Sequence, residues 1–284
     1  MKFSTLIGPE ALRERIGSPQ MLLVDCRFDL GDPAAGERAW SEAHIPGAMY
    51  AHLDRDLSGQ PTRTSGRHPL PAPEAFADTL GRWGVTPETQ VVAYDASAGM
   101  IASRLWWMLR WAGHDAVAVL DGGLQAWRDG GGILDGSIAR RPRSTFDLRL
   151  RPQMAVGTPE VVELLRSKAG RLVDARSVER FKGLAEPIDP VAGHVPGAVN
   201  VPCQSNLGPD GRFRAAEELG GLWQAVLGGD PADAIVCMCG SGVTACHNLL
   251  ALEHAGLPGA RLYVGSWSEW IRDPARPVAG QTGS

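Results

Sequence analysis

The chain has 284 residues, and single domains commonly have roughly 100–150, so the length favours two domains. Hydrophobic residues make up 44% and charged residues 21% of the sequence, which excludes a disordered or fibrous protein. The formal net charge of −4 provides no broad basic field, so we expect no nucleic-acid partner and no membrane partner. No stretch approaches the ~20 apolar residues that cross a bilayer, and charged residues stand near the start where a signal peptide needs an apolar core. We therefore expect a cytoplasmic protein.

The cysteine content predicts thiols and no metal centre. Five cysteines are an odd number at low density, which argues against a disulfide framework and for a reducing compartment. Cys237 and Cys239 form a Cys-x-Cys pair, a weak zinc signal, and the other cysteines follow no metal spacing. The two side chains would lie on one face of a strand. Cys237 could therefore form a reversible disulfide with Cys239, and the alternative is that Cys237 is a buried residue of the strand.

Three blocks of sequence occur twice in the same order. In the first, LLVDCRF resembles RLVDARS, and in the second, AHIPGAMY resembles GHVPGAVN. The three pairs are 22–28 with 171–177, 43–50 with 193–200, and 91–127 with 235–270. Ordered matches at a nearly constant offset indicate tandem copies of one fold.

The first copy alternates short apolar runs with helical segments. Strands are predicted at 22–24, 91–94 and 117–120. A helix is predicted to begin near Pro73, and a second helix over 102–111 is predicted to end at Gly113. Such alternation is typical of a parallel sheet with helices on both faces.

The second copy repeats this pattern. Strands are predicted at 172–173, 234–237 and 261–264, with a helix beginning near Pro159 and another over 245–255 before Gly256. The sequence thus predicts an α/β protein of two domains, residues 1–140 and 155–284, joined by a linker at 141–154.

The turn from Cys239 to Thr244 lies directly after a predicted strand and before a predicted helix. In a Gly-rich turn of this kind, successive N–H groups can point inward, and the positive end of the helix adds to the resulting anion site. A cysteine at its floor has a stabilised thiolate and is a nucleophile at neutral pH. Most unpaired cysteines are buried core residues, but the flanking Gly240 and Gly242 favour the nucleophile here.

The sequence resembles the two-domain rhodanese-type sulfurtransferases over almost the whole chain. The shared motifs are the Asp-x-Arg strand ends at Asp25 and Asp174, the His-x-Pro-Gly-Ala turns at His44 and His194, and the Leu-Asp-Gly-Gly-Leu-x-Ala-Trp element at 120–127. The resemblance implies that Cys239 is the catalytic residue of the second copy. Because Asp95 stands at the equivalent position, it implies that the first copy is catalytically silent.

The loop Cys-Gly-Ser-Gly-Val-Thr looks like that of the mercaptopyruvate branch of this family. The resemblance implies that Ser241 works with His68 and Asp54 in a set similar to that of the serine proteases, and spacing leaves Asp56 as an alternative to Asp54. The substrate-binding residues implied are Arg180 and the loop residues Gly240, Gly242, Val243 and Thr244.

Two features of the substrate site point to different donors. Gly240 and Ser241 place no cation after Cys239, so a singly charged keto acid is the better electrostatic match. The mercaptopyruvate branch carries a second arginine nine residues after Arg180, where this chain has Asp189, as the thiosulfate branch does. We expect 3-mercaptopyruvate as the donor, with thiosulfate as the alternative.

The implied reaction forms a persulfide on Cys239, releases pyruvate and passes sulfur to cyanide or to a thiol acceptor such as a thioredoxin-like protein. It needs no metal and no other cofactor. A sulfur carrier without enzymatic activity is a further alternative, and it would form no pyruvate. A cysteine-based phosphatase is disfavoured, because its Cys-x5-Arg motif would need an arginine where this chain has Ala245.

Overall fold

The computed structural model describes residues 2–280, and they fall into two units. Unit 1 comprises the described residues up to Gly59, together with Leu70–Arg151 and Pro209–Phe213. Unit 2 comprises Gln60–Pro69, Pro152–Gly208 and the described residues from Arg214 onward. No helix within residues 2–280 combines the length and the apolar character needed to span a membrane.

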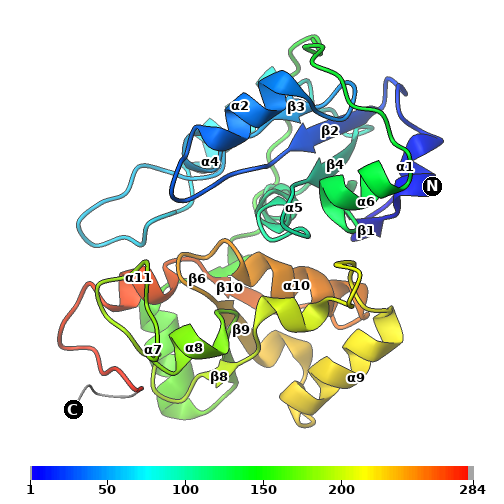
Figure 1. Cartoon of the computed structure of the whole chain (residues 1–284). Helices are drawn as coiled ribbons and strands as arrows, with labels where there is room; N and C mark the ends of the chain where they lie inside the picture. Colours follow the sequence, from blue (N-terminus) through cyan, green and yellow to red (C-terminus); the bar gives the residue numbers. More distant parts are fainter. Residues whose placement is uncertain (1, 281–284) are drawn as a thin grey trace. The chain divides into compact units, whose positions relative to one another are not determined.

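Unit 1 contains a five-stranded parallel sheet in the order β1-β5-β4-β2-β3 (Figure 1). The strands are β1 (Leu6–Ile7), β2 (Met21–Asp25), β3 (Met49–Tyr50), β4 (Gln90–Tyr94) and β5 (Val117–Leu120). The helices are α1 (Pro9–Arg13), α2 (Ala35–Glu42), α3 (Leu53–Asp56), α4 (Pro73–Arg82), α5 (Ala102–Trp111) and α6 (Gly123–Asp129). Each predicted strand and helix of this copy is therefore present.

Helices cover both faces of the unit 1 sheet. On one face, Val92 packs in a buried cluster with Leu12 of α1 and Trp127 of α6. Because side chains alternate along a strand, Val91 and Ala93 point to the opposite face. They are fully buried there, and α5 packs on β4 and β5. The apolar runs of the sequence reflect this burial on both sides.

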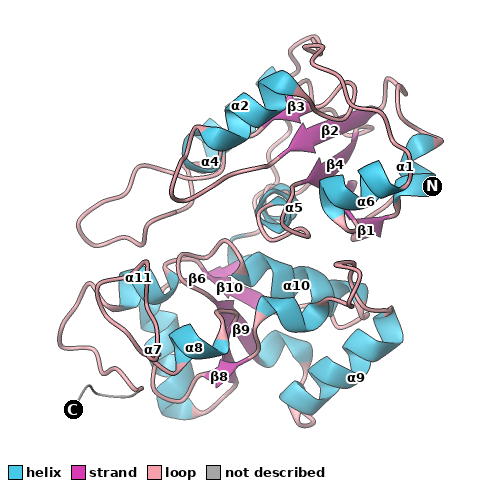
Figure 2. Ribbon diagram, in the orientation of Figure 1, coloured by secondary structure: helices cyan, strands magenta, loops and turns pink. Residues whose placement is uncertain are grey.

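Unit 2 repeats the arrangement strand for strand, in the order β6-β10-β9-β7-β8 (Figure 2). The strands are β6 (Ala155–Val156), β7 (Arg171–Asp174), β8 (Val199–Asn200), β9 (Ile235–Met238) and β10 (Arg261–Tyr263). The α-helices are α7 (Thr158–Ser167), α8 (Val178–Phe181), α9 (Ala216–Leu227), α10 (Ala245–His254) and α11 (Ser266–Trp270), and the 3₁₀ helices are η1 (Pro152–Met154), η2 (Cys203–Asn206) and η3 (Ala232–Ala234). The identical strand order confirms the duplication that the repeated blocks predict.

Two segments, 60–69 and 209–213, belong to a different unit from the chain on either side of them. Residues 60–69 belong to unit 2, although the chain on either side of them belongs to unit 1. The expected linker 141–154 is held along unit 1 as far as Arg151. Its backbone N–H groups at Ser144 and Arg149 donate to Gly81 and Ala112 at 2.9 and 3.0 Å. These hydrogen bonds explain why this segment is part of a folded unit.

The turn between β4 and α5 is built around the carboxylate of Asp95, which is buried. Its Oδ1 accepts hydrogen bonds from the N–H groups of Ser97 and Gly99 at 2.8 and 2.9 Å. Its Oδ2 accepts from those of Ile101 and Ala102, both at 2.8 Å. The first unit thus fills the amide-lined turn with the carboxylate of its own Asp95, at the position that Cys239 takes in the second.

We predict that Asp95→Asn lowers the free energy of unfolding by about 1–3 kcal/mol, because an amide cannot replace a buried carboxylate that accepts hydrogen bonds from four N–H groups. Urea denaturation followed by circular dichroism measures the change. The exposed Glu88→Gln is the matched control, since it removes the same charge from the same unit. Equal stability of the two variants would contradict the prediction.

Candidate functional site

Cys239 begins the turn between β9 and α10 and lies at the carboxyl end of a central strand. Its side chain is 2% exposed, and its Sγ accepts a hydrogen bond from the N–H of Gly242 at 3.2 Å. The first residues of α11 fix its backbone: its N–H donates to Ser266 Oγ at 3.1 Å, and its carbonyl accepts from Trp267 N–H at 3.0 Å. The sulfur is therefore held on a backbone amide next to the start of a helix, where a negative charge is stabilised.

Gly242 is required by the geometry of this turn. Its φ is +77°, in the left-handed region that favours glycine. A Cβ at this position would also lie 2.4 Å from the backbone oxygen of Val264. The second glycine of the Gly-x-Gly pattern thus allows its amide to face Cys239.

Three of the other four cysteines are poor nucleophiles. Burial raises the pKa of Cys26 and of Cys237 well above the ordinary value. It also raises the pKa of Cys203 to about 12, and the neighbouring Cys239 adds to that rise. At neutral pH these three side chains are thiols, and the thiolate is the reactive form. No disulfide links any of the five cysteines, all of which lie within the described residues.

His68 and Ser241 are brought together as predicted. His68 Nδ1 lies 2.8 Å from Ser241 Oγ, a hydrogen-bond distance, and both side chains are buried. The contact exists because the segment 60–69 packs in unit 2. It places a group that can carry a proton beside the hydroxyl two residues after Cys239.

Asp54 lies in α3 of unit 1, and its N–H donates to His52 Nδ1 at 3.1 Å. Asp56 Oδ2 accepts the N–H of His52 at 2.9 Å. Burial raises the pKa of Asp56 above its ordinary value. The pairing of either carboxylate with His68 stays a prediction.

Arg180 lies in α8 and is held by two carboxylates. Its Nε donates to Glu186 at 3.0 and 3.1 Å, and its Nη2 contacts Asp189 Oδ2 at 3.0 Å. Burial alone would raise the pKa of Glu186, but hydrogen bonds from Arg180 and from backbone N–H groups outweigh it, so this pKa lies below its usual value. Asp189 therefore contacts the predicted clamp at the position where an arginine was expected.

Arg67 is a site residue that the sequence analysis missed. Its Nη1 forms an ion pair with Asp189 Oδ1, and its backbone N–H donates to Ser268 Oγ at 3.1 Å. A Cβ built on Gly240 would lie 3.0 Å from Arg67 Nη2 and 3.4 Å from Arg180 Nη2. Two guanidinium groups thus face the residue next to Cys239. The available signal was that Arg67 directly precedes His68.

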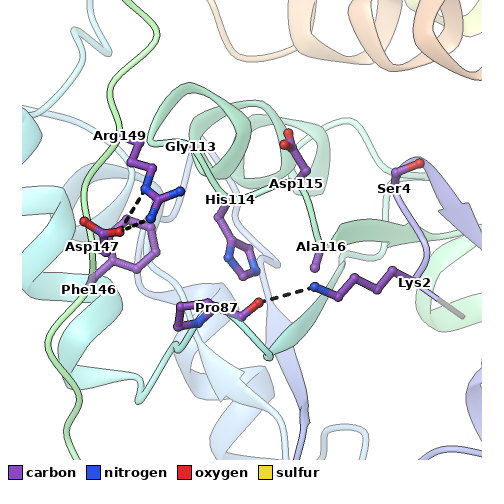
Figure 3. Close-up of a pocket in the computed structure, with 10 residues that line it drawn as sticks. All are labelled: Lys2, Ser4, Pro87, Gly113, His114, Asp115, Ala116, Phe146, Asp147 and Arg149. Atoms are coloured by element: carbon purple, nitrogen blue, oxygen red, sulfur yellow. Dashed lines mark hydrogen bonds and ion pairs between the residues drawn. The ribbon is translucent and has the colours of Figure 1, made fainter.

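A separate pocket in unit 1 contains none of the predicted site residues (Figure 3). Its charged groups have partners: Lys2 Nζ donates to the carbonyl of Pro87 at 3.4 Å, and Arg149 pairs with Asp147 at 2.6 Å. His114 contacts the Thr89 carbonyl at 2.8 Å, and burial lowers its pKa. Within residues 2–280, no group of three or more His, Cys, Asp or Glu side chains is placed to hold a metal ion.

Comparisons with known proteins agree on one family. A model described as a rhodanese-like domain matches residues 8–129 and 158–273. A probable 3-mercaptopyruvate sulfurtransferase of Pseudomonas aeruginosa is 47% identical over 283 residues, covering 98% of this chain and 99% of that protein. A putative thiosulfate sulfurtransferase of Mycobacterium tuberculosis is 39% identical over 269 residues, covering 94% of this chain and 93% of the relative. The solved structure of a 3-mercaptopyruvate sulfurtransferase from Leishmania major has a TM-score of 0.84 at 31% identity and covers 95% of this chain and 76% of that chain.

The two matched regions coincide with the two sheets. The first contains β2 to β5 and the second contains β7 to β10, so each match spans the repeated core of one unit. The relatives are similar over nearly the whole chain, and the second matched region includes the turn at Cys239. The chain belongs to the rhodanese family and carries two copies of its domain.

Proposed function

We propose that the protein is a 3-mercaptopyruvate sulfurtransferase that uses Cys239 to carry the sulfur. The observation that carries this proposal is the placement of Cys239 Sγ on the Gly242 amide, beside the His68–Ser241 pair and two arginines. Such a site supplies a nucleophile, a proton carrier and cations for a carboxylate. Several similar proteins that span nearly the whole chain carry this activity in their names.

In the first step, the guanidinium of Arg180 binds the carboxylate of the donor. The Cys239 thiolate attacks the donor sulfur, an S–S bond forms, and the C–S bond breaks. The electron pair moves into an enolate, which gains a proton at carbon to give pyruvate. Ser241 polarises the carbonyl oxygen that becomes negative, and His68 moves the proton through its 2.8 Å contact with Ser241. Asp54 is proposed to orient His68, as the aspartate of a Ser-His-Asp triad orients its histidine.

In the second step, the acceptor takes the outer sulfur of the Cys239 persulfide. A thiolate or cyanide attacks that sulfur, and the Cys239 thiolate leaves. The Gly242 amide stabilises the negative sulfur in both steps, and Gly240, Val243 and Thr244 are proposed to complete the cradle. A thioredoxin-like protein is the proposed acceptor and the cytoplasm the proposed location, because five cysteines without a disulfide fit a reducing compartment, where acceptor thiols also stay reduced.

Thiosulfate is the second candidate donor. Two comparisons favour it: position 189 lacks the second arginine that the mercaptopyruvate branch is expected to carry, and the relative from Mycobacterium tuberculosis is named a putative thiosulfate sulfurtransferase. A sulfur carrier without enzymatic activity is the third candidate. It would need neither Arg180 nor His68 and would release no pyruvate.

We predict that Cys239→Ser abolishes pyruvate formation from 3-mercaptopyruvate, because a hydroxyl cannot form the persulfide at neutral pH. Cys203→Ser is the matched control: Cys203 is also buried in unit 2, but its raised pKa keeps it a thiol, so turnover is expected to persist. Circular dichroism checks that both variants fold. Retained turnover in Cys239→Ser would disprove the role of this residue.

We predict that His68→Ala and Ser241→Ala each lower kcat/KM for 3-mercaptopyruvate by about 100-fold, the scale of general acid–base catalysis. Because the two side chains act through one contact, the double variant is expected to lose little more than either single variant. Steady-state pyruvate formation measures all three. Losses that multiply in the double variant would show that the residues act independently.

A further inference from the structure

Asp189 joins two guanidinium groups at the substrate side of the cysteine turn. Arg67 contacts its Oδ1, and Arg180 contacts its Oδ2 at 3.0 Å. The Asp189 side chain is 2% exposed, so both contacts are made by a buried carboxylate. One acid therefore fixes the positions of two cations from distant segments of the chain.

Both cations keep hydrogen-bond donors available for an anion. Arg67 Nε is buried and has no hydrogen-bond partner among the described residues. Arg67 Nη2 lies 3.0 Å from a Cβ built on Gly240, and Arg180 Nη2 and Nη1 lie 3.4 and 3.5 Å from it. A buried donor without an acceptor is costly, and an oxygen atom of an anionic substrate would satisfy it.

The charges around these donors sum to zero when all groups are ionised. Arg67 and Arg180 contribute two positive charges, and Asp189 and Glu186 contribute two negative ones. Arg176 also reaches Glu186, at 3.4 Å, but its own partner is Asp174 at 2.7 Å. This second pair leaves the sum unchanged. The site offers directed donors without a net positive charge.

We propose that Asp189, by bridging Arg67 and Arg180, makes the site selective for singly charged sulfur donors over doubly charged ones. This inference rests on the proposed function and assigns Arg67 as a substrate-binding residue and Asp189 as a positioning and specificity residue. A keto acid brings one negative charge to a neutral set of donors. Thiosulfate brings two, and a neutral set compensates neither of them, so the second charge adds to the cost of binding.

The test compares kcat/KM for thiosulfate and for 3-mercaptopyruvate, with cyanide as the acceptor and thiocyanate as the common product. Asp189→Asn retains the shape of the bridge but adds one net positive charge. We expect it to raise the ratio of thiosulfate to mercaptopyruvate activity about tenfold, as one unbalanced charge at short range can do. The change is expected in KM for thiosulfate more than in kcat.

Further variants separate charge from structural damage. Arg67→Gln makes the set negative, and we expect it to lower the ratio below that of the unchanged protein. The double variant Arg67→Gln/Asp189→Asn is neutral again, and its ratio is expected to return towards that of the unchanged protein. The control Glu179→Gln removes an exposed acid from α8 and is expected to leave the ratio as it was.

Equal ratios in Asp189→Asn and Glu179→Gln would overturn the inference. If thermal unfolding shows that Asp189→Asn does not fold, Arg67→Gln alone decides, and an unchanged ratio overturns the inference. Failure of the proposed function gives a different result from failure of this inference, because the unchanged protein would then release no pyruvate from 3-mercaptopyruvate.

Discussion

Backbone N–H groups that donate to a side-chain acceptor atom at the end of a central strand shape both halves of this protein. In unit 1 the acceptor atoms are the carboxylate oxygens of Asp95, and four N–H groups donate to them. In unit 2 the atom is Cys239 Sγ, which accepts from the Gly242 N–H. The same turn thus contains a carboxylate in one copy and the sulfur of Cys239 in the other. The two copies differ in the side chain that accepts these hydrogen bonds and in the number of N–H groups that donate to it.

In unit 2, carboxylates hold the two arginines near Cys239 in fixed positions. Each guanidinium near Gly240 contacts a carboxylate, so the cations are ordered before any substrate arrives. Ordered donors cost less reorganisation when charge develops during the reaction. Burial raises the pKa of Asp189, and the nearby Glu186 adds to that rise, while Arg67 and Arg180 oppose it. The two cations therefore compensate part of the cost of burying the Asp189 carboxylate, which in turn holds them in position.

Much of the fold could be predicted from the sequence. Strands of a parallel sheet buried on both faces appear as short apolar runs, and α5 and α10 end before glycines with positive φ, at Gly113 and Gly256. The Gly-x-Gly turn likewise identified Cys239. The position of residues 60–69 in unit 2 could not be predicted, because a loop without periodicity gives no sign of its distant contacts. Arg67 was missed for this reason, and Asp189 was recognised as a departure without its bridging role.

The central claim is that Cys239 receives sulfur from a keto acid and holds it until an acceptor arrives. Mass spectrometry of the protein after incubation with 3-mercaptopyruvate in the absence of an acceptor tests it directly, with pyruvate measured in the same sample. We predict one added sulfur atom per chain, on the peptide that contains Cys239, together with one equivalent of pyruvate. Sulfur located on Cys203 or Cys237, or an unmodified protein without pyruvate, would contradict the account.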